Sequence, residues 1–126
     1  MSGKISIGKE INERLPEIVN DISPHKTVVI TDNKLEELWL DDILSLVDAE
    51  PIVIPEGEEN KSLENVKIAW NSLLEMNFTR KSLVIALGGG MITDISAFIS
   101  STFKRGTKLG LIPTTLLAQV DAAIGG

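Results

Sequence analysis

Three consecutive glycines, Gly88 to Gly90, are followed four residues later by Asp94. Glycine lacks a Cβ, so a bulky anionic ligand can approach such a backbone closely. A helix that begins at this turn would also point its first N–H groups at the ligand. Alone, the motif predicts a phosphate site and a simple turn equally well. It also departs from the usual dinucleotide fingerprint, because Thr93 stands where the last glycine belongs.

Three aspartates could add chemistry to this turn. Asp32 follows a β-branched apolar run, where it could hold a ribose or equally cap the next helix. Asp94, expected in the first helical turn, could accept hydroxyl hydrogen bonds, although a purely structural role in the helix dipole is favoured. Asp121 lies in an apolar helical segment, where a carboxylate needs a partner or an adjacent polar site. Asp121 is therefore the strongest functional candidate of the three.

The remaining polar candidates have simple structural roles as alternatives. Glu56, Glu58 and Glu59 belong to a mixed-charge loop that would ordinarily be solvated surface, while Lys61 could offer its charge to a phosphate. Thr114 and Thr115 follow an apolar run and would cap a last helix.

The elements that must position these residues alternate between strands and helices. Five short apolar segments are expected to be strands: 4–8, 27–30, 51–54, 83–87 and 109–112. Between them, four sets of apolar residues recur at helical spacing, each expected on one buried face: Ile11, Leu15, Ile18, Val19 and Ile22; Leu35, Leu38, Trp39, Ile43, Leu46 and Val47; Leu63, Val66, Trp70, Leu73 and Leu74; Met91, Ile95, Phe98, Ile99 and Phe103.

Two residue types refine the expected helices. Pro16 falls inside the first set, so that helix should either begin or kink there. Glycine costs up to about 1 kcal/mol inside a helix, which places the three glycines outside the last one. The alternation as a whole predicts an α/β fold, a Rossmann-like parallel sheet with helices on both faces. Ligands of such sheets lie beyond the carboxyl ends of the strands.

Composition excludes several classes of protein. The 126 residues, 43% of them hydrophobic, suit one soluble domain, and no apolar run approaches membrane-spanning length. Cysteine is absent and His25 is the sole histidine, so thiolate and His-rich metal sites are excluded. We expect His25 to be exposed and uninvolved. The net charge of −6 argues against nucleic acid as a partner, and we expect a cytoplasmic protein.

The segment GGGMITD at 88–94, followed by PTTLLAQVDAAIGG at 113–126, resembles 3-dehydroquinate synthase, a sugar-phosphate cyclase family similar in fold to glycerol dehydrogenases. PEGEENK at 55–61 is similar to the cofactor loop of that family, and TDN at 31–33 to its first strand end. The resemblance covers essentially the whole chain. It implies that residues 1–126 form the NAD-binding domain of a two-domain enzyme. The family commonly has glycine at Thr93 and Ala97 and a serine near Ala123.

The resemblance also implies roles for individual residues. Asp32, Glu58 and Lys61, within the loop Glu56, Gly57, Glu58, Glu59, Asn60 and Lys61, would hold the adenosine half of NAD. Gly89 and Gly90, with the following turn through Met91, Ile92, Thr93 and Asp94, would hold the pyrophosphate and nearby ribose. Thr114, Thr115 and Leu117 would line the nicotinamide side. Asp121 would face cofactor and substrate as the catalytic residue.

The implied reaction converts 3-deoxy-D-arabino-heptulosonate 7-phosphate into 3-dehydroquinate and phosphate, a carbon–oxygen lyase step of the shikimate pathway and aromatic amino acid biosynthesis. NAD oxidises a ring hydroxyl transiently, and a divalent metal, zinc or cobalt, polarises the oxidised centre. The family's catalytic lysine, its metal ligands and the C-terminal metal- and substrate-binding domain would follow Gly126. We therefore expect the 126 residues alone to be inactive, and the parent enzyme to be a homodimer without membrane or nucleic-acid partners.

Three alternatives remain open, namely a related sugar-phosphate cyclase, a glycerol-dehydrogenase-like oxidoreductase and a stand-alone nucleotide-binding module. Net NADH formation would favour the oxidoreductase, and phosphate release without net NADH the synthase. Without a second domain, the apolar residues of the last helix would be partly exposed, which predicts self-association: Leu116, Leu117, Val120 and Ile124.

Overall fold

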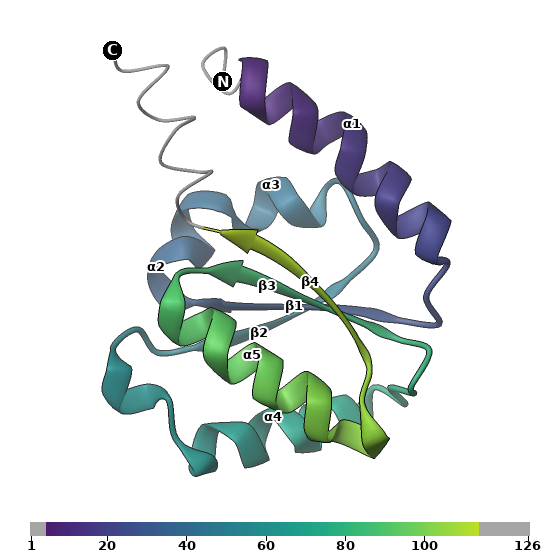
Figure 1. Ribbon diagram of the computed structural model, residues 1–126. Coiled ribbons are helices and arrows are strands. Elements are labelled where there is room, and N and C mark those ends of the chain that lie inside the picture. Colours follow the sequence, from purple (N-terminus) through teal and green to yellow (C-terminus); the bar gives the residue numbers. More distant parts are fainter. Residues whose placement is uncertain (1–4, 114–126) are drawn as a thin grey trace.

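Four parallel strands form one sheet within residues 5–113, the part of the chain that this computed structural model describes (Figure 1). Their order across the sheet is β2-β1-β3-β4. They span Thr27–Asp32 (β1), Glu50–Ile54 (β2), Leu83–Gly88 (β3) and Lys108–Pro113 (β4). The two central strands, β1 and β3, are nearly continuous runs of apolar residues because both of their faces are covered. The predicted parallel α/β sheet is confirmed.

Helices cover both faces of this sheet (Figure 1). One face carries α1 (Ile5–Ile22) and a second segment in which α2 (Asn33–Leu35) continues through the π-helix η2 (Glu36–Leu40) into α3 (Asp41–Leu44). The other face carries α4 (Leu63–Glu75) and α5 (Gly90–Thr102). Two short 3₁₀ helices, η3 (Glu58–Asn60) and η4 (Phe103–Arg105), lie in the connections.

Alternate residues of the strands build a separate apolar core on each face. Val28, Ile30 and Val84 join the core beneath α4 and α5. Val29 and Ile85 join the opposite core, beneath the helices that precede β2. The fold therefore fixes the strand ends from both sides, which is what a site at those ends requires.

The strand expected at 4–8 is wrong, because residues from Ile5 onward belong to α1. Five alternating residues are a weak local signal, and the helical spacing of Ile11, Leu15 and Val19 extends upstream over them. The helix contains Pro16 in its interior, so it does not begin there. The described residues accordingly carry four strands rather than five.

The predicted apolar faces are correct in outline and wrong at individual positions. Leu38 is 55% exposed, while its neighbours Trp39 and Leu40 are buried. The cause is η2, whose wider turn rotates the side chains away from regular α-helical spacing. Ile18 in α1 also points outward.

In α4 and α5 the buried stripes are shifted from the predicted ones. Val66, Ala69 and Leu73 face inward in α4, which leaves Leu63 and Leu74 exposed. In α5 the stripe includes Ile92, which was not predicted, and excludes Phe98, which is 47% exposed. Apolar residues outnumber the positions that the sheet can cover, so spacing alone could not choose between overlapping stripes.

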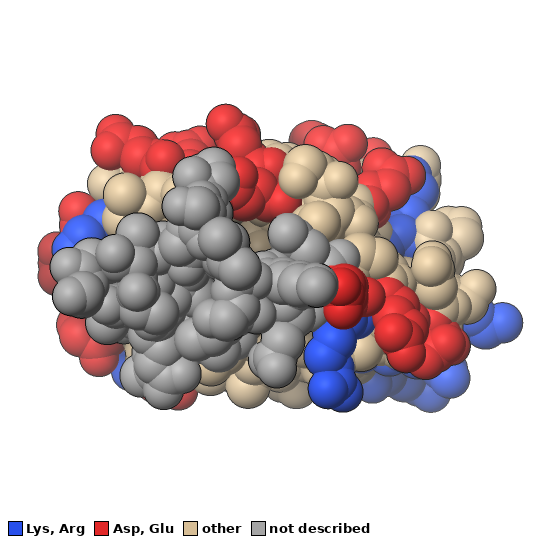
Figure 2. Space-filling view, turned by 90° about the horizontal axis from the view of Figure 1, so that it is seen from above, with Lys and Arg blue, Asp and Glu red and all other residues tan. Residues whose placement is uncertain are grey.

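Acidic residues outnumber basic ones by 18 to 12 in the sequence. Figure 2 shows Asp and Glu side chains gathered along one margin of the visible face. Helices η2 and α3 contribute four acidic residues within seven positions: Glu36, Glu37, Asp41 and Asp42. Across residues 5–113, no helix combines the length and the apolarity that crossing a bilayer would need.

Candidate functional site

The sheet divides at the carboxyl ends of its two central strands. β1 stays paired with β2 through Asp32, and β3 stays paired with β4 through Gly88. Pairing between β1 and β3 ends earlier, at Ile30 and Ala86. The helices that follow these two strands also run to opposite faces of the sheet, as Figure 1 shows. This is the topological switch point at which doubly wound sheets bind their ligands.

A buried side chain bridges the point of division. The Thr31 hydroxyl donates a 2.8 Å hydrogen bond to the carbonyl oxygen of Leu87, and Thr31 is 0% exposed. This bond pairs a carbonyl that a regular ladder would have paired with a backbone N–H. The two strand ends are therefore separated and still held at a fixed spacing.

The region beyond the carboxyl ends of β1 and β3 is called the crevice below, and the glycine turn lies on its β3 side. Gly88 is the buried last residue of β3, Gly89 is the N-cap of α5, and Gly90 is the first residue of that helix. The prediction that none of the glycines lies in a helix is wrong for Gly90. Gly90 is the first residue of α5, and glycine is tolerated at a helix end better than in a helix interior. Among residues 5–113, no side chain caps α5 and no atom lies within 4 Å of a Cβ built at Gly90. An anion can therefore approach this helix start.

Asp32, the last residue of β1, lies on the other side of the crevice. One carboxylate oxygen accepts a 2.8 Å hydrogen bond from the Leu35 N–H, so Asp32 is the N-cap of α2. The capping role predicted for Asp32 is confirmed, and the ribose role stays a prediction. The second carboxylate oxygen is the atom that such a role would use.

The acidic loop, residues 56–61, closes the same edge of the sheet beyond β2. Its first backbone N–H, at Glu56, donates to the Asn33 Oδ1 at 2.7 Å. Gly57 has φ +113°, a backbone conformation that glycine adopts without strain. Residues Glu58 to Asn60 then form η3. The predicted cofactor loop thus lies next to the end of β1.

Lys61 connects this loop to α5 through an ion pair with Asp94. Its Nζ lies 3.4 Å from the Asp94 Oδ2 and 3.6 Å from the Glu58 Oε1. The hydrogen bond with Asp94, followed by the charge of Glu58, raises the pKa of Lys61 above its ordinary value. Asp94 is the fifth residue of α5, so its expected place in the first turn is wrong. The structure brings together Lys61 and Glu58 of the acidic loop with Asp94 of the glycine-turn segment, three predicted residues from two distant motifs.

Some predicted site residues lie differently or outside the described residues. Ile92 is 1% exposed and packs in the core, so only its backbone could serve a ligand. Met91 and Thr93 are half-buried. The four predicted residues of the C-terminal segment fall outside residues 5–113: Thr114, Thr115, Leu117 and Asp121. His25 is exposed, as predicted, and distant in the fold from these strand ends.

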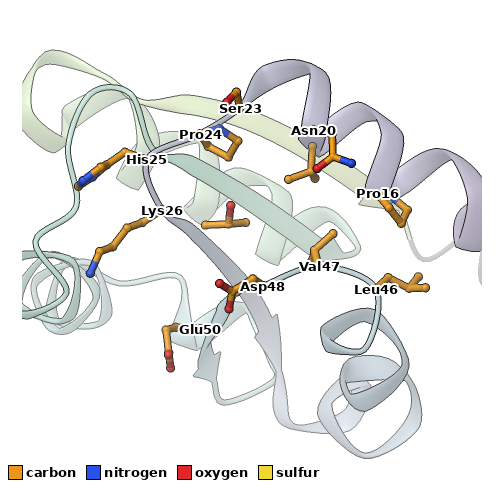
Figure 3. Close-up of a pocket in the computed structure, with 13 residues that line it drawn as sticks. Pro16, Asn20, Ser23, Pro24, His25, Lys26, Leu46, Val47, Asp48 and Glu50 are labelled. Atoms are coloured by element: carbon orange, nitrogen blue, oxygen red, sulfur yellow. The ribbon is translucent and has the colours of Figure 1, made fainter.

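A cavity of about 570 Å³ lies at the opposite edge of the sheet, where β1 and β2 begin (Figure 3). Asn20 of α1 and Asp48 before β2 lie on either side of it. None of the predicted site residues that the structure describes lines this cavity. A smaller cavity of about 350 Å³ lies between α4 and α5, with Lys61 and Asp94 at its rim and Leu63 and Phe98 among its walls.

Two residues of the TDN segment at 31–33 were given no individual role from the sequence. Thr31 and Asn33 flank Asp32, and each uses its side chain to hold a neighbouring segment. The available signal was their position at the end of a buried strand, where polar side chains replace backbone pairing. In the span from residue 5 to residue 113, no three His, Asp or Glu side chains converge as metal ligands would.

Comparisons with known proteins show which family the sequence resembles. The family profile described as 3-dehydroquinate synthase N-terminal matches residues 51–126. A 3-dehydroquinate synthase from Pyrococcus furiosus is 57% identical over 115 residues, which is 89% of this chain and 34% of the relative. The chain thus spans about a third of the length of the curated relatives it matches.

Solved structures agree at the level of the fold. The crystal structure of 2-deoxy-scyllo-inosose synthase matches with a TM-score of 0.72 at 17% identity, over 81% of this chain and 31% of that one. A 2-epi-5-epi-valiolone synthase from Streptomyces hygroscopicus, solved with NAD+ and Zn2+ bound, matches with a TM-score of 0.64 at 27% identity. That match covers 79% of this chain and 30% of the synthase.

Proposed function

Because this chain belongs to the 3-dehydroquinate synthase family, we propose that it binds NAD at the crevice between β1 and β3. The pyrophosphate would lie against the start of α5, at Gly89 and Gly90. The adenosine ribose would lie between Asp32 and the acidic loop. The cofactor of a solved relative, which holds NAD+, supports the choice of ligand.

The early end of the β1–β3 ladder is the observation that supports this proposal most. It separates the glycine turn from Asp32 at the point where the strand order reverses. The spatial order β2-β1-β3-β4 also matches the start of the doubly wound order 2-1-3-4-5, whose ligand site lies at the switch point between strands 1 and 3. The glycine turn follows β3 and Asp32 ends β1, so both border that switch point.

Charge limits how the pyrophosphate can be held. The crevice is bordered by the carboxylates of Asp32, Glu58 and Asp94, and Lys61 is the basic residue among them. An anionic ligand therefore depends on backbone N–H groups of the helix start and on the Lys61 ammonium. Asp94 and Glu58 keep that ammonium charged and in place until the ligand arrives.

We propose that the parent enzyme converts 3-deoxy-D-arabino-heptulosonate 7-phosphate into 3-dehydroquinate and phosphate. NAD supplies the transient oxidation, and this chain supplies the cofactor's placement. A second domain would contribute the divalent metal and most of the substrate site, which is supported by the one-third coverage of the relatives. Asp121 would face the substrate. A cytoplasmic homodimer belongs to the same proposal, and light scattering of the purified parent would test its stoichiometry.

Calorimetric titration with NAD tests the site in this chain. The wild-type chain should bind one NAD, and Gly90→Ala should weaken binding at least tenfold because its methyl group occupies the anion's approach. Gly110→Ala is the matched control, since a Cβ there also meets no atom of the described part of the chain within 4 Å but lies in mid-β4. Equal affinity of the two variants would contradict the proposed site.

The reaction is tested on the parent enzyme. Phosphate release from the heptulosonate phosphate without net NADH is the expected result. Accumulation of NADH would instead identify an alcohol dehydrogenase, and turnover of a different sugar phosphate a related cyclase.

A further inference from the structure

The acidic loop is attached to the sheet through one asparagine. Asn33, the first residue of α2, uses its amide oxygen to accept the Glu56 N–H at 2.7 Å. The two residues are 23 positions apart, and this contact joins the end of β1 to the residue that begins the loop beyond β2.

The anchoring continues through the loop into α4. The Glu56 carbonyl accepts from the Asn60 Nδ2 at 3.0 Å, and the Asn60 carbonyl accepts from the Asn65 Nδ2 at 2.8 Å. The Asn65 backbone in turn donates to Ser62, the N-cap of α4. Asparagine amides thus bind backbone groups at both ends of Glu56–Asn60, so the loop has a defined conformation although most of its residues are exposed.

Lys61 depends on this arrangement. It lies five positions after Glu56 and reaches across to Asp94 in α5. A lysine side chain has many rotamers, and an exposed ion pair alone holds it weakly. The position of its backbone therefore decides whether the ammonium remains beside the crevice.

We propose that Asn33 is a positioning residue of the site: by fixing the Glu56 N–H, it sets the loop so that Lys61 reaches the crevice. This inference rests on the proposed NAD site for its functional part. The structural part, control of the loop by Asn33, stands apart from any ligand. Asn33 acts through Lys61 and needs no contact of its own with the cofactor.

Hydrogen exchange of the chain without ligand tests the structural part. Asn33→Ala should raise exchange at Glu56 and through Lys61 by about fivefold, the usual worth of one hydrogen bond. Asn33→Asp keeps an acceptor oxygen and should restore the wild-type rate. Asn71→Ala, on the exposed side of α4, is the control and should change nothing. Unaltered exchange at Glu56 in Asn33→Ala would overturn the proposal.

A double-mutant cycle on NAD affinity tests the functional part. Asn33→Ala should weaken NAD binding about fivefold in the wild-type background and have no effect when Lys61→Ala is already present. Equal effects in both backgrounds would overturn the proposal, because they would mean that Asn33 acts without Lys61. If the wild-type chain binds no NAD, the proposed function fails, and the exchange measurement still decides whether Asn33 holds the loop.

Discussion

Replacing Gly88 by alanine should destabilise the fold because the new methyl group would collide with one side chain, that of Ile92. Gly88 ends β3 in a buried position, and a Cβ built there would lie 2.8 Å from the Ile92 Cβ and 3.1 Å from each of its Cγ atoms. The Cβ of Ile92 is fixed by the helix backbone, so no change of rotamer can relieve this contact. The start of α5 would have to move away from the sheet.

The expected cost follows from two opposing effects. Overpacking of a dense core costs about 1–3 kcal/mol. Alanine also reduces the entropy of the unfolded chain relative to glycine, which returns about 0.4–1 kcal/mol. The net loss should be about 1–2 kcal/mol, and with a urea m-value of about 1–3 kcal/mol/M the unfolding midpoint should fall by about 1 M.

Equilibrium urea unfolding measures this loss, with Gly90→Ala as the control for the entropy effect alone. Gly90→Ala should unfold at the wild-type midpoint or above it, because its Cβ has free space. Ile92→Val removes the terminal methyl and keeps the three contacting carbons, so it should not rescue Gly88→Ala. A Gly88→Ala midpoint equal to that of Gly90→Ala would refute the argument from close strand–helix packing.

Three further perturbations address the same edge of the sheet. Gly57→Ala should cost about 1–3 kcal/mol in thermal unfolding, because φ is +113° there, and an unchanged melting temperature would contradict it. Asp32→Ala should lose about 0.5–2 kcal/mol with its N-cap bond, while Asp32→Asn should retain most of it. The pKa of Lys61 is raised above 10.5, first by the hydrogen bond to Asp94 and then by the charge of Glu58. The contribution of charged Lys61 to the stability of the folded state is therefore complete below pH 10.5 and is lost as the pH rises through the higher folded pKa. Asp94→Asn should lower the pKa of Lys61, measured by NMR, toward 10.5.

The sheet was predictable because its central strands carry a signal with one interpretation. The β-branched run Thr27–Ile30 and the apolar run Leu83–Leu87 are too short for helices and too apolar for surface strands. The segment at 4–8 failed because alternation over five residues competes with helical spacing that continues downstream. The predicted burial of Leu38 is wrong because a π turn changes the spacing of the side chains. The predicted burial of Phe98 is wrong because α5 has more apolar residues than the sheet can cover, and the spacing does not show which of them are buried.

The sequence predicted which residues belong to the site but not which of them contact one another. The glycine turn, Asp32 and the loop with Lys61 each carry a local signal, and strand order places them at one edge. The pairing of Lys61 with Asp94 depends on how α4 and α5 lie side by side. The bond from Asn33 to Glu56 likewise depends on the spacing of β1 and β2, which no pattern within either segment encodes.

The hydroxyl of Thr31 has a consequence for the energetics of ligand capture. By satisfying the Leu87 carbonyl, it lets the two halves of the sheet separate without leaving a buried polar group unpaired. The two strand ends thus have this arrangement without a ligand, so little of the binding free energy would be spent on ordering them. Thr31→Val would keep the shape of the side chain and remove the hydroxyl. In that variant, either the Leu87 carbonyl would remain buried without a hydrogen bond, or β1 and β3 would move together to pair it. The Thr31 hydroxyl therefore keeps the two strand ends apart.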